Sequence, residues 1–362
     1  MKKKPMKIAQ LSPLWLSLPP KKYGGTERIA YYLTEGLVQR GHKVTLFASG
    51  DSKTKAKLVP GWPKCLIKEK IHGKPIPWGN HVIPLLNISQ AFEQAHKFDI
   101  LHAHENSTGL SNFFTRLVKT PVVITVHDDF PVLKNKDRWA AFRKYKNNNY
   151  ISISKSHQKL GKKLGLNFIG NVYNGTDLKF LKFNEKAKDY LIWLGRSAPN
   201  KGAKEAIVIA KKAKEKLILA GRIDKNSPVS VEYYHKHMKP YFNKSIKYVG
   251  EVGDPQKGKF LGNAKALLYP ILWEEPFGLV MIEAMACGTP VIVFDRGSAR
   301  EVVKDGKTGF VVKDIKEAVE AIKKIDQINR KECRKWVEKN FTIKKMVDDY
   351  EKLYYKILEK KR

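Results

Sequence analysis

The chain has few cysteines, no long apolar run and few acidic residues for its length of 362. Its three cysteines, Cys65, Cys287 and Cys333, lie far apart, so we expect neither a disulfide framework nor a structural zinc site, and a reducing compartment fits best. No apolar run approaches the roughly 18 residues that cross a bilayer, which argues against an integral membrane protein. No loop carries a D-x-D metal motif, so metal dependence is not predicted.

The shortage of acids leaves 69 Lys and Arg against 35 Asp and Glu, a net charge of +34 that is spread over both halves of the chain. Such a field attracts nucleic acid, acidic membrane surfaces and phosphorylated small molecules, although a lysine-rich proteome would explain it equally well. The most basic segment is 134–163, where Trp139, Phe142 and Tyr145 lie among the cations. It is either a contact for an anionic partner or, slightly favoured, a solvated helix face.

Short apolar runs alternate with longer segments in which apolar residues recur every three or four positions. This alternation predicts an α/β protein with two doubly wound, Rossmann-like parallel sheets facing a central cleft. The expected strands are residues 7–11, 43–48, 100–103, 122–126, 150–153, 169–173, 190–194, 217–220, 246–249, 266–269, 291–294 and 310–312. The expected helices are residues 27–40, 89–97, 109–119, 137–147, 155–164, 201–214, 231–239, 255–262, 279–286, 299–303 and 341–360.

The pattern breaks after residue 177, where a polar, lysine-rich stretch separates the two series. We therefore expect an N-terminal domain over 1–178 that binds the acceptor and a C-terminal domain over 179–342 that binds the donor. A final helix over 343–362 is expected to pack back toward the N-terminal domain. Ligands in such folds bind at the carboxyl ends of the strands.

The richest candidate site runs from the strand at 266–269 into the helix at 279–286. Glu275 precedes this helix, Glu283 lies within it, and Gly278 lets backbone N–H groups approach an anion at the helix start. The two acids could bind sugar and ribose hydroxyls. Alternatively, Glu275 caps the helix and Glu283 is a surface charge, although a carboxylate among so many apolar neighbours normally requires a strong partner.

Three weaker signals lie in other loops. Arg196 and Lys201 follow a strand and could bind the phosphates of a departing diphosphate. Gly24 and Gly25 precede the first expected helix, where they could present N–H groups to phosphates or form a simple turn. His127 ends a strand and, taken alone, is more often a structural histidine.

In order along the chain, nine segments together resemble the retaining family-four glycosyltransferases with the GT-B fold. They are GGTER, RGHKVTLFASG, TVHDD, ISISKS, NGTD, LGRSAPNKG, YVGEV, EEPFGLVMIEAMACGTPVI and GSAREVVKDGKTGFVV. Of these features, the spacing of Glu275 and Glu283 in its sequence context is the one that is specific to the family. One segment departs from the family, which usually has G-G-x-x-E where this chain reads Gly297-Ser298-Ala299-Arg300-Glu301.

The resemblance implies a role for each candidate residue. Arg196 and Lys201 would hold the donor diphosphate, Glu283 the ribose and Glu275 the transferred sugar, which His127 would also reach. The remaining donor-binding residues would contribute through the backbone or border the base: Gly24, Gly25, Gly250, Phe277, Gly278 and Leu279.

The implied reaction transfers a sugar, with retention, from a nucleoside-diphosphate sugar such as UDP-glucose or GDP-mannose to an acceptor hydroxyl. It needs no metal or other cofactor. The acceptor is unknown, and the basic segment suggests an anionic or lipid-linked one. We expect a cytoplasmic protein, with peripheral contact at the inner membrane face as an option. The alternatives are a nucleotide-sugar 2-epimerase on the same scaffold and, less favoured, a nucleic-acid-binding protein.

Overall fold

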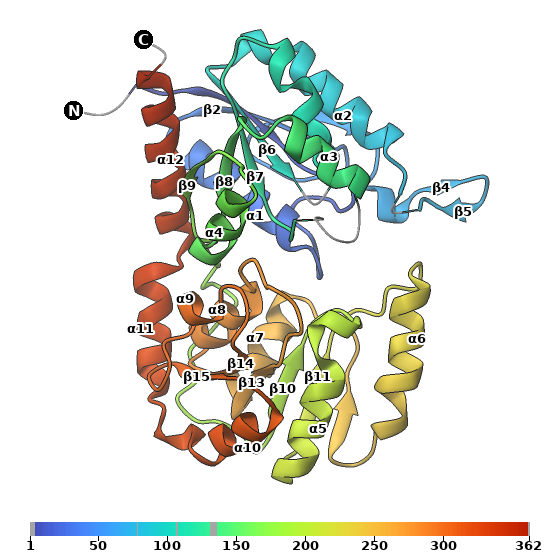
Figure 1. Ribbon diagram of the computed structural model, residues 1–362, viewed down its shortest axis with the longest axis vertical. Helices are drawn as coiled ribbons and strands as arrows, with labels where there is room; N and C mark the ends of the chain where they lie inside the picture. The colour runs from blue at the N-terminus through green and yellow to red at the C-terminus, as the bar shows by residue number, and fades with distance from the viewer. Residues whose placement is uncertain (1–3, 78, 106–107, 131–135, 361–362) are drawn as a thin grey trace. The chain divides into compact units, whose positions relative to one another are not determined.

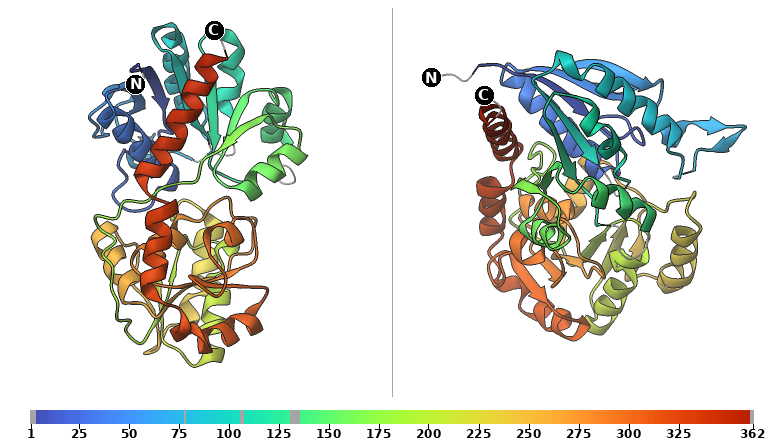
Figure 2. Two further views of the ribbon diagram at one scale, coloured as in Figure 1. Left: turned by 90° about the vertical axis from the view of Figure 1, so that its left-hand side faces the viewer. Right: turned by 45° about the horizontal axis from the view of Figure 1, so that its top comes forward.

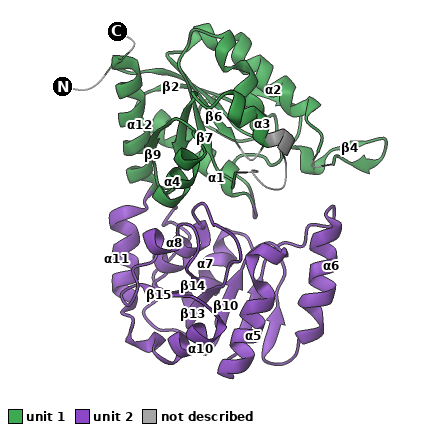
Figure 3. Cartoon of the chain, viewed as in Figure 1, with its two compact units in different colours: residues 1–20, 24–175, 343–362 green, residues 21–23, 176–342 purple. Residues whose placement is uncertain are grey.

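Two parallel β-sheets organise the chain, each within its own compact unit (Figure 3). The computed structural model describes residues 4–77, 79–105, 108–130 and 136–360, without the side chains of 136–138. Unit 1 comprises Met1–Pro20, Gly24–Gly175 and Ile343–Arg362, and unit 2 comprises Lys21–Tyr23 and Thr176–Thr342. The prediction of two Rossmann-like, parallel-sheet domains is confirmed.

The sheet of unit 1 has seven strands in the order β3-β2-β1-β6-β7-β8-β9, and all neighbouring strands are parallel. Strands β1, β2, β6 and β7 are almost entirely buried, as expected where helices cover both faces of a sheet. The strands are β1 (Lys7–Leu11), β2 (Lys43–Ser49), β3 (Lys57–Trp62), β6 (Ile100–Glu105), β7 (Val122–Val126), β8 (Asn149–Ser152) and β9 (Phe168–Asn171).

The helices of unit 1 include one from the far end of the chain. They are α1 (Gly25–Gln39), α2 (Val82–Glu93), α3 (Lys136–Lys144), α4 (Lys155–Lys163) and α12 (Ile343–Glu359), with 3₁₀ turns η1 (Leu66–Lys68), η2 (Ala95–Lys97) and η3 (Leu110–Leu117). Helix α12 packs beside α1 (Figures 1 and 2). Arg40, just after α1, forms ion pairs with Asp348 and Glu351 of α12.

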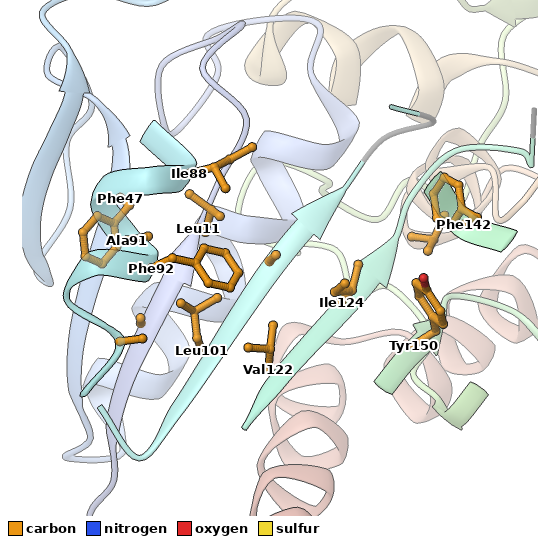
Figure 4. Packing of buried hydrophobic residues seen from close by; sticks show 14 of the residues in the cluster. Leu11, Phe47, Ile88, Ala91, Phe92, Leu101, Val122, Ile124, Phe142 and Tyr150 are labelled. Carbon is orange, nitrogen blue, oxygen red and sulfur yellow. The ribbon is translucent and has the colours of Figure 1, made fainter. Parts of the chain in front are cut away.

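One face of this sheet forms an apolar core with α2 and the segments after β7 (Figure 4). Leu11, Leu101 and Ile124 from neighbouring strands pack there with Phe92 and Phe142, and all five side chains are buried. Burying such a side chain stabilises the fold by about 2 kcal/mol. This core holds the carboxyl ends of β1, β6 and β7 in register.

Unit 2 has six parallel strands in the order β12-β11-β10-β13-β14-β15. The strands are β10 (Leu191–Leu194), β11 (Leu217–Ala220), β12 (Ile246–Tyr248), β13 (Ala266–Tyr269), β14 (Val291–Phe294) and β15 (Gly309–Val312). The helices are α5 (Ala203–Ala213), α6 (Pro228–His237), α7 (Asp254–Asn263), α8 (Leu279–Ala286), α9 (Ala299–Val302), α10 (Ile315–Lys323) and α11 (Arg330–Asn340), with 3₁₀ turns η4 (Pro199–Lys201), η5 (Lys239–Tyr241) and η6 (Ile325–Gln327).

Most predicted elements are present, and the differences have physical causes. Strand β3 was not expected because Pro60 and Gly61 interrupt its pattern. It lies at the edge of the sheet, where a proline is tolerated. The small antiparallel hairpin of β4 (Lys70–Ile71) and β5 (Lys74–Pro75) was also missed. The expected helix at 89–97 begins earlier, at Val82, and the one at 109–119 is the 3₁₀ segment η3.

Among the described residues, no helix is both long and apolar enough to cross a membrane.

Candidate functional site

The carboxyl ends of five neighbouring strands of unit 2 carry most of the candidate residues. Because β12, β11, β10, β13 and β14 are parallel, the loops that follow them emerge at one edge of the sheet. Gly250 follows β12, Arg196 and Lys201 follow β10, Glu275 follows β13, and the turn at Gly297 follows β14.

The loop after β10 is held in place by its backbone. The buried indole of Trp193 donates to the Lys201 carbonyl oxygen at 2.9 Å. The next residue, Gly202, has φ 72°, and a Cβ there would lie 1.9 Å from the Pro270 carbonyl oxygen. Only glycine fits this left-handed position without a clash. The two constraints bring Lys201 to the loop that follows β13.

Glu275 and Lys201, which lie 74 residues apart in sequence, form an ion pair with an Nζ–Oε2 distance of 2.8 Å. The same carboxylate oxygen accepts hydrogen bonds from the Tyr269 hydroxyl at 2.6 Å and from the Trp273 indole at 2.9 Å. Burial, followed by the charge of Glu275, raises the pKa of Tyr269 well above its usual value, so this hydroxyl remains a donor. The ammonium group of Lys201 also lies 4.3 Å from the centre of the Trp273 ring.

Helix α8 begins directly after this cluster. Gly278 is its N-cap with φ 76°, and Phe277 and Leu279 flank it. Ser298 stands where the family usually has the second glycine of G-G-x-x-E. It does not distort the neighbouring turn, because its φ of −80° is one that any residue adopts. Its hydroxyl donates to the Phe277 carbonyl oxygen at 2.8 Å, and its backbone N–H donates to the Glu275 carbonyl oxygen at 3.0 Å. The serine therefore helps to hold the α8 entry.

Glu283 is buried within α8, which rules out the surface-charge interpretation. Its partner is Lys257 of α7, with an Nζ–Oε1 distance of 2.5 Å, and Lys257 also pairs with Asp254 at 3.1 Å. The apolar neighbours of Glu283 predict a strong partner for this acid but not which residue it is. The sequence around Lys257 does not indicate its pairing with Glu283, since it shows an ordinary i,i+3 spacing to Asp254.

The other two candidates of unit 2 lie at the same sheet edge but outside this cluster. Arg196 is half-buried, and within the described part of the chain its Nε atom has no hydrogen-bond partner. Gly250 has φ 76°, and its carbonyl oxygen accepts a hydrogen bond from Gly221 after the neighbouring strand β11. The structure brings together Lys201, Glu275 and the start of α8, and it places Glu283 further along the same helix.

The remaining candidates belong to unit 1. Gly24 is the N-cap of α1, with φ 135°, and Gly25 is the first residue of that helix. His127 follows β7, and its backbone N–H donates to the carbonyl oxygen of Glu105 at the end of β6. They therefore lie in a different unit from the lysine–glutamate cluster.

His127 takes part in a group of histidines that the sequence analysis missed. Its Nε2 lies 2.9 Å from Nδ1 of His104, and the two rings are stacked. Next to His104 on the same strand face is His102, which is fully buried. Burial, followed by repulsion between neighbouring rings, holds the pKa of all three well below the usual 6.5. Polar residues at alternate positions of an otherwise apolar strand were the available signal.

The aromatic residues of the basic segment are not available to a partner. Phe142 and Tyr145 are buried and Trp139 packs against the core, which contradicts the expectation of aromatics interleaved with cations on a surface. Residues 134–135 of that segment lie outside the described residues. The cations from Arg143 to Lys163 whose exposure is described lie exposed on the surface of unit 1.

Across residues 4–77, 79–105, 108–130 and 136–360, no group of three or more His, Cys, Asp or Glu side chains is arranged to hold a metal ion. The polar groups of the site are instead cations, a helix start and carboxylates, a set suited to a ligand that carries both phosphate and hydroxyl groups.

Relatives and solved structures resemble the chain over most of its length. A phosphatidyl-myo-inositol mannosyltransferase of Mycobacterium leprae is 24% identical over 335 residues, which cover 85% of this chain and 83% of that protein. A sucrose-phosphate synthase of Thermosynechococcus elongatus has a TM-score of 0.81 at 19% identity, covering 98% and 99% of the two chains. Anabaena HepE in complex with UDP-glucose has a TM-score of 0.74 at 19% identity, covering 97% and 100%.

Two family models match consecutive parts of the chain. Residues 23–180 match Glycosyltransferase Family 4, and residues 175–342 match Glycosyl transferases group 1. These matches agree with the two parallel-sheet units. The chain belongs to the group 1, family 4 glycosyltransferases and is a glycosyltransferase enzyme with the GT-B fold.

Proposed function

We propose that the protein transfers a sugar from a nucleoside-diphosphate sugar to an acceptor hydroxyl, with retention of the anomeric configuration and without a metal ion. The observation that carries the proposal is the contact of Lys201 with Glu275. In a nucleotide sugar the distal phosphate is bonded directly to the anomeric carbon. A phosphate-binding cation and a hydroxyl-binding acid must therefore lie side by side, as these two residues do.

The reaction breaks the bond between the anomeric carbon and the phosphate oxygen and forms one to the acceptor oxygen. Negative charge grows on the departing diphosphate, where Lys201, Arg196 and the N–H groups at the start of α8 would stabilise it. The acceptor proton passes to the leaving phosphate on the same face of the sugar. Glu275 would accept hydrogen bonds from the transferred sugar, which His127 would also contact, and Glu283 would bind the ribose.

The backbone would complete the donor site. Gly278 is the N-cap of α8 between Phe277 and Leu279, where free N–H groups of the helix would bind an anion. Gly25, with Gly24, would bring the first turn of α1 to the phosphates, and Gly250 would border the base. We propose UDP-glucose or GDP-mannose as the donor class, supported by the UDP-glucose bound to HepE and by the mannosyltransferase relatives.

A thermal-shift screen against a panel of nucleotide sugars tests the donor. A ligand present at 100 times its Kd stabilises the protein by about 2.7 kcal/mol, which is a measurable rise in Tm. Incubation of the best ligand without an acceptor should leave its sugar unchanged. If no nucleotide sugar raises Tm, the proposed donor class is wrong, and if the sugar is isomerised without an acceptor, transfer is not the reaction.

Lys201→Ala tests the diphosphate contact. Removal of one charge-assisted contact to a leaving group raises the barrier by about 2 to 4 kcal/mol, so turnover should fall roughly 30- to 1000-fold. Lys204→Ala is the matched control, because Lys204 is an exposed lysine in the first turn of α5 only three residues away. Equal activity of the two variants would remove Lys201 from the mechanism.

We also propose a lipid-linked acceptor with an anionic head group. Two observations support it. The mannosyltransferase relatives carry phosphatidyl-myo-inositol in their name, and unit 1 combines exposed cations with exposed apolar side chains. Val82 and Leu86 of α2 are 69% and 49% exposed, and Phe113 and Leu117 of the contacting segment η3 are 46% and 75% exposed. Exposed apolar groups beside cations are typical of a surface that binds an anionic membrane.

Sedimentation with liposomes tests this surface. We expect binding to vesicles that contain anionic lipid, weaker binding in high salt, and loss of binding in Leu117→Asp. Val229→Asp is the control, since Val229 is 59% exposed but lies in unit 2. Equal binding to neutral vesicles, or none at all, would contradict the anionic lipid surface.

A further inference from the structure

A continuous chain of hydrogen bonds leads from His127 into the interior of unit 1. From Nε2 of His127 it passes to Nδ1 of His104 at 2.9 Å and from Nε2 of His104 to Oε1 of Gln10 at 2.9 Å. The other end of the Gln10 amide, Nε2, donates to the Tyr354 hydroxyl at 3.1 Å. This network, which we call the histidine chain, continues from Tyr354 to Nδ1 of His102 at 2.6 Å.

The chain ends at Thr125, whose hydroxyl lies 2.7 Å from Nε2 of His102. Its members come from β1, β6, β7 and α12, with His127 directly after β7, and all lie within unit 1. Except for His127, every member is fully buried or nearly so. A buried polar group without a partner is costly, so each donor along the chain must face an acceptor.

The orientation of the Gln10 amide then gives the histidine chain a direction. The Gln10 Oε1 atom only accepts, so His104 must carry its proton on Nε2, and a neutral His104 then accepts at Nδ1. His127 must therefore donate from Nε2. On the other side, Gln10 donates to Tyr354, which leaves the tyrosine proton for Nδ1 of His102. Burial keeps the pKa of the three histidines low, which is consistent with neutral rings throughout.

We propose that Gln10 and Tyr354 are positioning residues that hold His127 in its Nε2–H tautomer, so that Nδ1 offers a lone pair to a hydroxyl of the transferred sugar. Among the described residues of the protein, Nδ1 of His127 makes no hydrogen bond. The inference rests on the proposed function, in which His127 contacts the sugar. It assigns a role in substrate positioning to α12, whose Tyr354 lies more than 220 residues after His127.

The orientation of the Gln10 amide is the decisive point. If the amide turned over, its nitrogen would donate to His104, every donor along the chain would reverse, and Nδ1 of His127 would carry the proton. Tyr354 opposes this reversal only if its hydroxyl is oriented by His102. The Tyr350 hydroxyl lies 3.1 Å from that of Thr125, where either oxygen can donate, so it does not set the direction.

Two-dimensional NMR of protein labelled with ¹⁵N-histidine tests the proposal, because long-range coupling patterns distinguish the two tautomers. His127→Gln identifies the His127 signals. We expect the Nε2–H pattern in the unmodified protein and a mixed or reversed pattern in Tyr354→Phe and in Gln10→Met. The matched control Tyr350→Phe, one turn earlier on α12 and equally buried, should leave the pattern of His127 unchanged.

Kinetics supply the second readout. In Tyr354→Phe we expect kcat to fall by about tenfold, as for other residues that orient a functional histidine, with little change in donor affinity. An Nδ1–H pattern in the unmodified protein would overturn the proposal, and so would an unchanged pattern in both variants. If Tyr354→Phe failed to fold, an unchanged pattern in Gln10→Met would overturn it. A failure of the proposed function is distinguishable, because it would appear as absent donor binding while the tautomer pattern stayed as expected.

Discussion

At the scale of single residues, Glu275 and Glu283 are buried acids of unit 2 that are held by different partners. Glu275 receives three donors on one oxygen, including the ammonium group of Lys201. Glu283 is held by Lys257, a residue with no candidate role in the reaction. An incoming phosphate would attract Lys201 away from Glu275 and so leave the acid ready to accept sugar hydroxyls. The ion pair with Lys257 compensates the burial of the Glu283 carboxylate inside an apolar helix.

In unit 1, the buried acid Glu27 in the first turn of α1 makes the stability depend on pH. Burial raises the pKa of Glu27 to about 7, above the 4.5 of an unfolded chain. Between these values the folded state binds the additional proton, so its stability falls as the pH rises. Relative to Glu27→Gln, we expect the unmodified protein to lose about 3 kcal/mol at pH 8 and under about 1 kcal/mol at pH 5.

Thermal unfolding of both proteins at the two pH values measures this difference. Glu93→Gln on α2 is the control, because its carboxylate is exposed and its removal should change Tm little at either pH. The assignment fails if Glu27→Gln has the same effect on Tm at pH 5 and pH 8.

At the scale of secondary-structure elements, the entry into α5 depends on a single glycine. Gly202→Ala would place a Cβ 1.9 Å from the Pro270 carbonyl oxygen at φ 72°, so the loop that carries Lys201 must move. Gly306→Ala has nearly the same φ, 69°, but its Cβ would meet nothing within 4 Å, so it should cost only about 1 kcal/mol. We expect Gly202→Ala to cost several kcal/mol more and to reduce turnover strongly, as measured by urea unfolding and a transfer assay. Equal losses in the two variants would show that backbone strain alone matters.

The elements also show what can be predicted from sequence. Buried strands such as Val122–Val126 and Val291–Phe294 were predicted at their observed bounds, because a run of apolar residues between loops has few other structures available. The candidate residues after those strands follow from the rule that sites form at carboxyl ends. In contrast, the Lys257–Glu283 pair and the contact of Gln10 with Tyr354 join residues from distant parts of the sequence. No local pattern encodes such contacts, since they depend on the completed tertiary structure.

At the scale of the whole molecule, the polypeptide returns to unit 1 after it has formed most of unit 2. Helix α11 belongs to unit 2, and α12, which begins at Ile343, belongs to unit 1. Each of the two helices has a buried valine, so the two can be compared directly. Val337 of α11 and Val347 of α12 lie ten residues apart and are both almost completely buried. Val347 packs against α1, where its side chain lies beside Gly36.

Because each valine belongs to the core of one unit, truncation should weaken only that unit. We expect Val337→Ala and Val347→Ala each to cost about 2 kcal/mol, the loss that follows from deleting buried methyl groups. Amide hydrogen exchange locates the loss, since partial unfolding exposes contiguous cooperative regions. Val347→Ala should speed exchange in β1 and β6 and leave β13 and β14 unchanged, and Val337→Ala should do the reverse. If each variant speeds exchange equally in both sheets, the units unfold together and α12 does not belong to unit 1 alone.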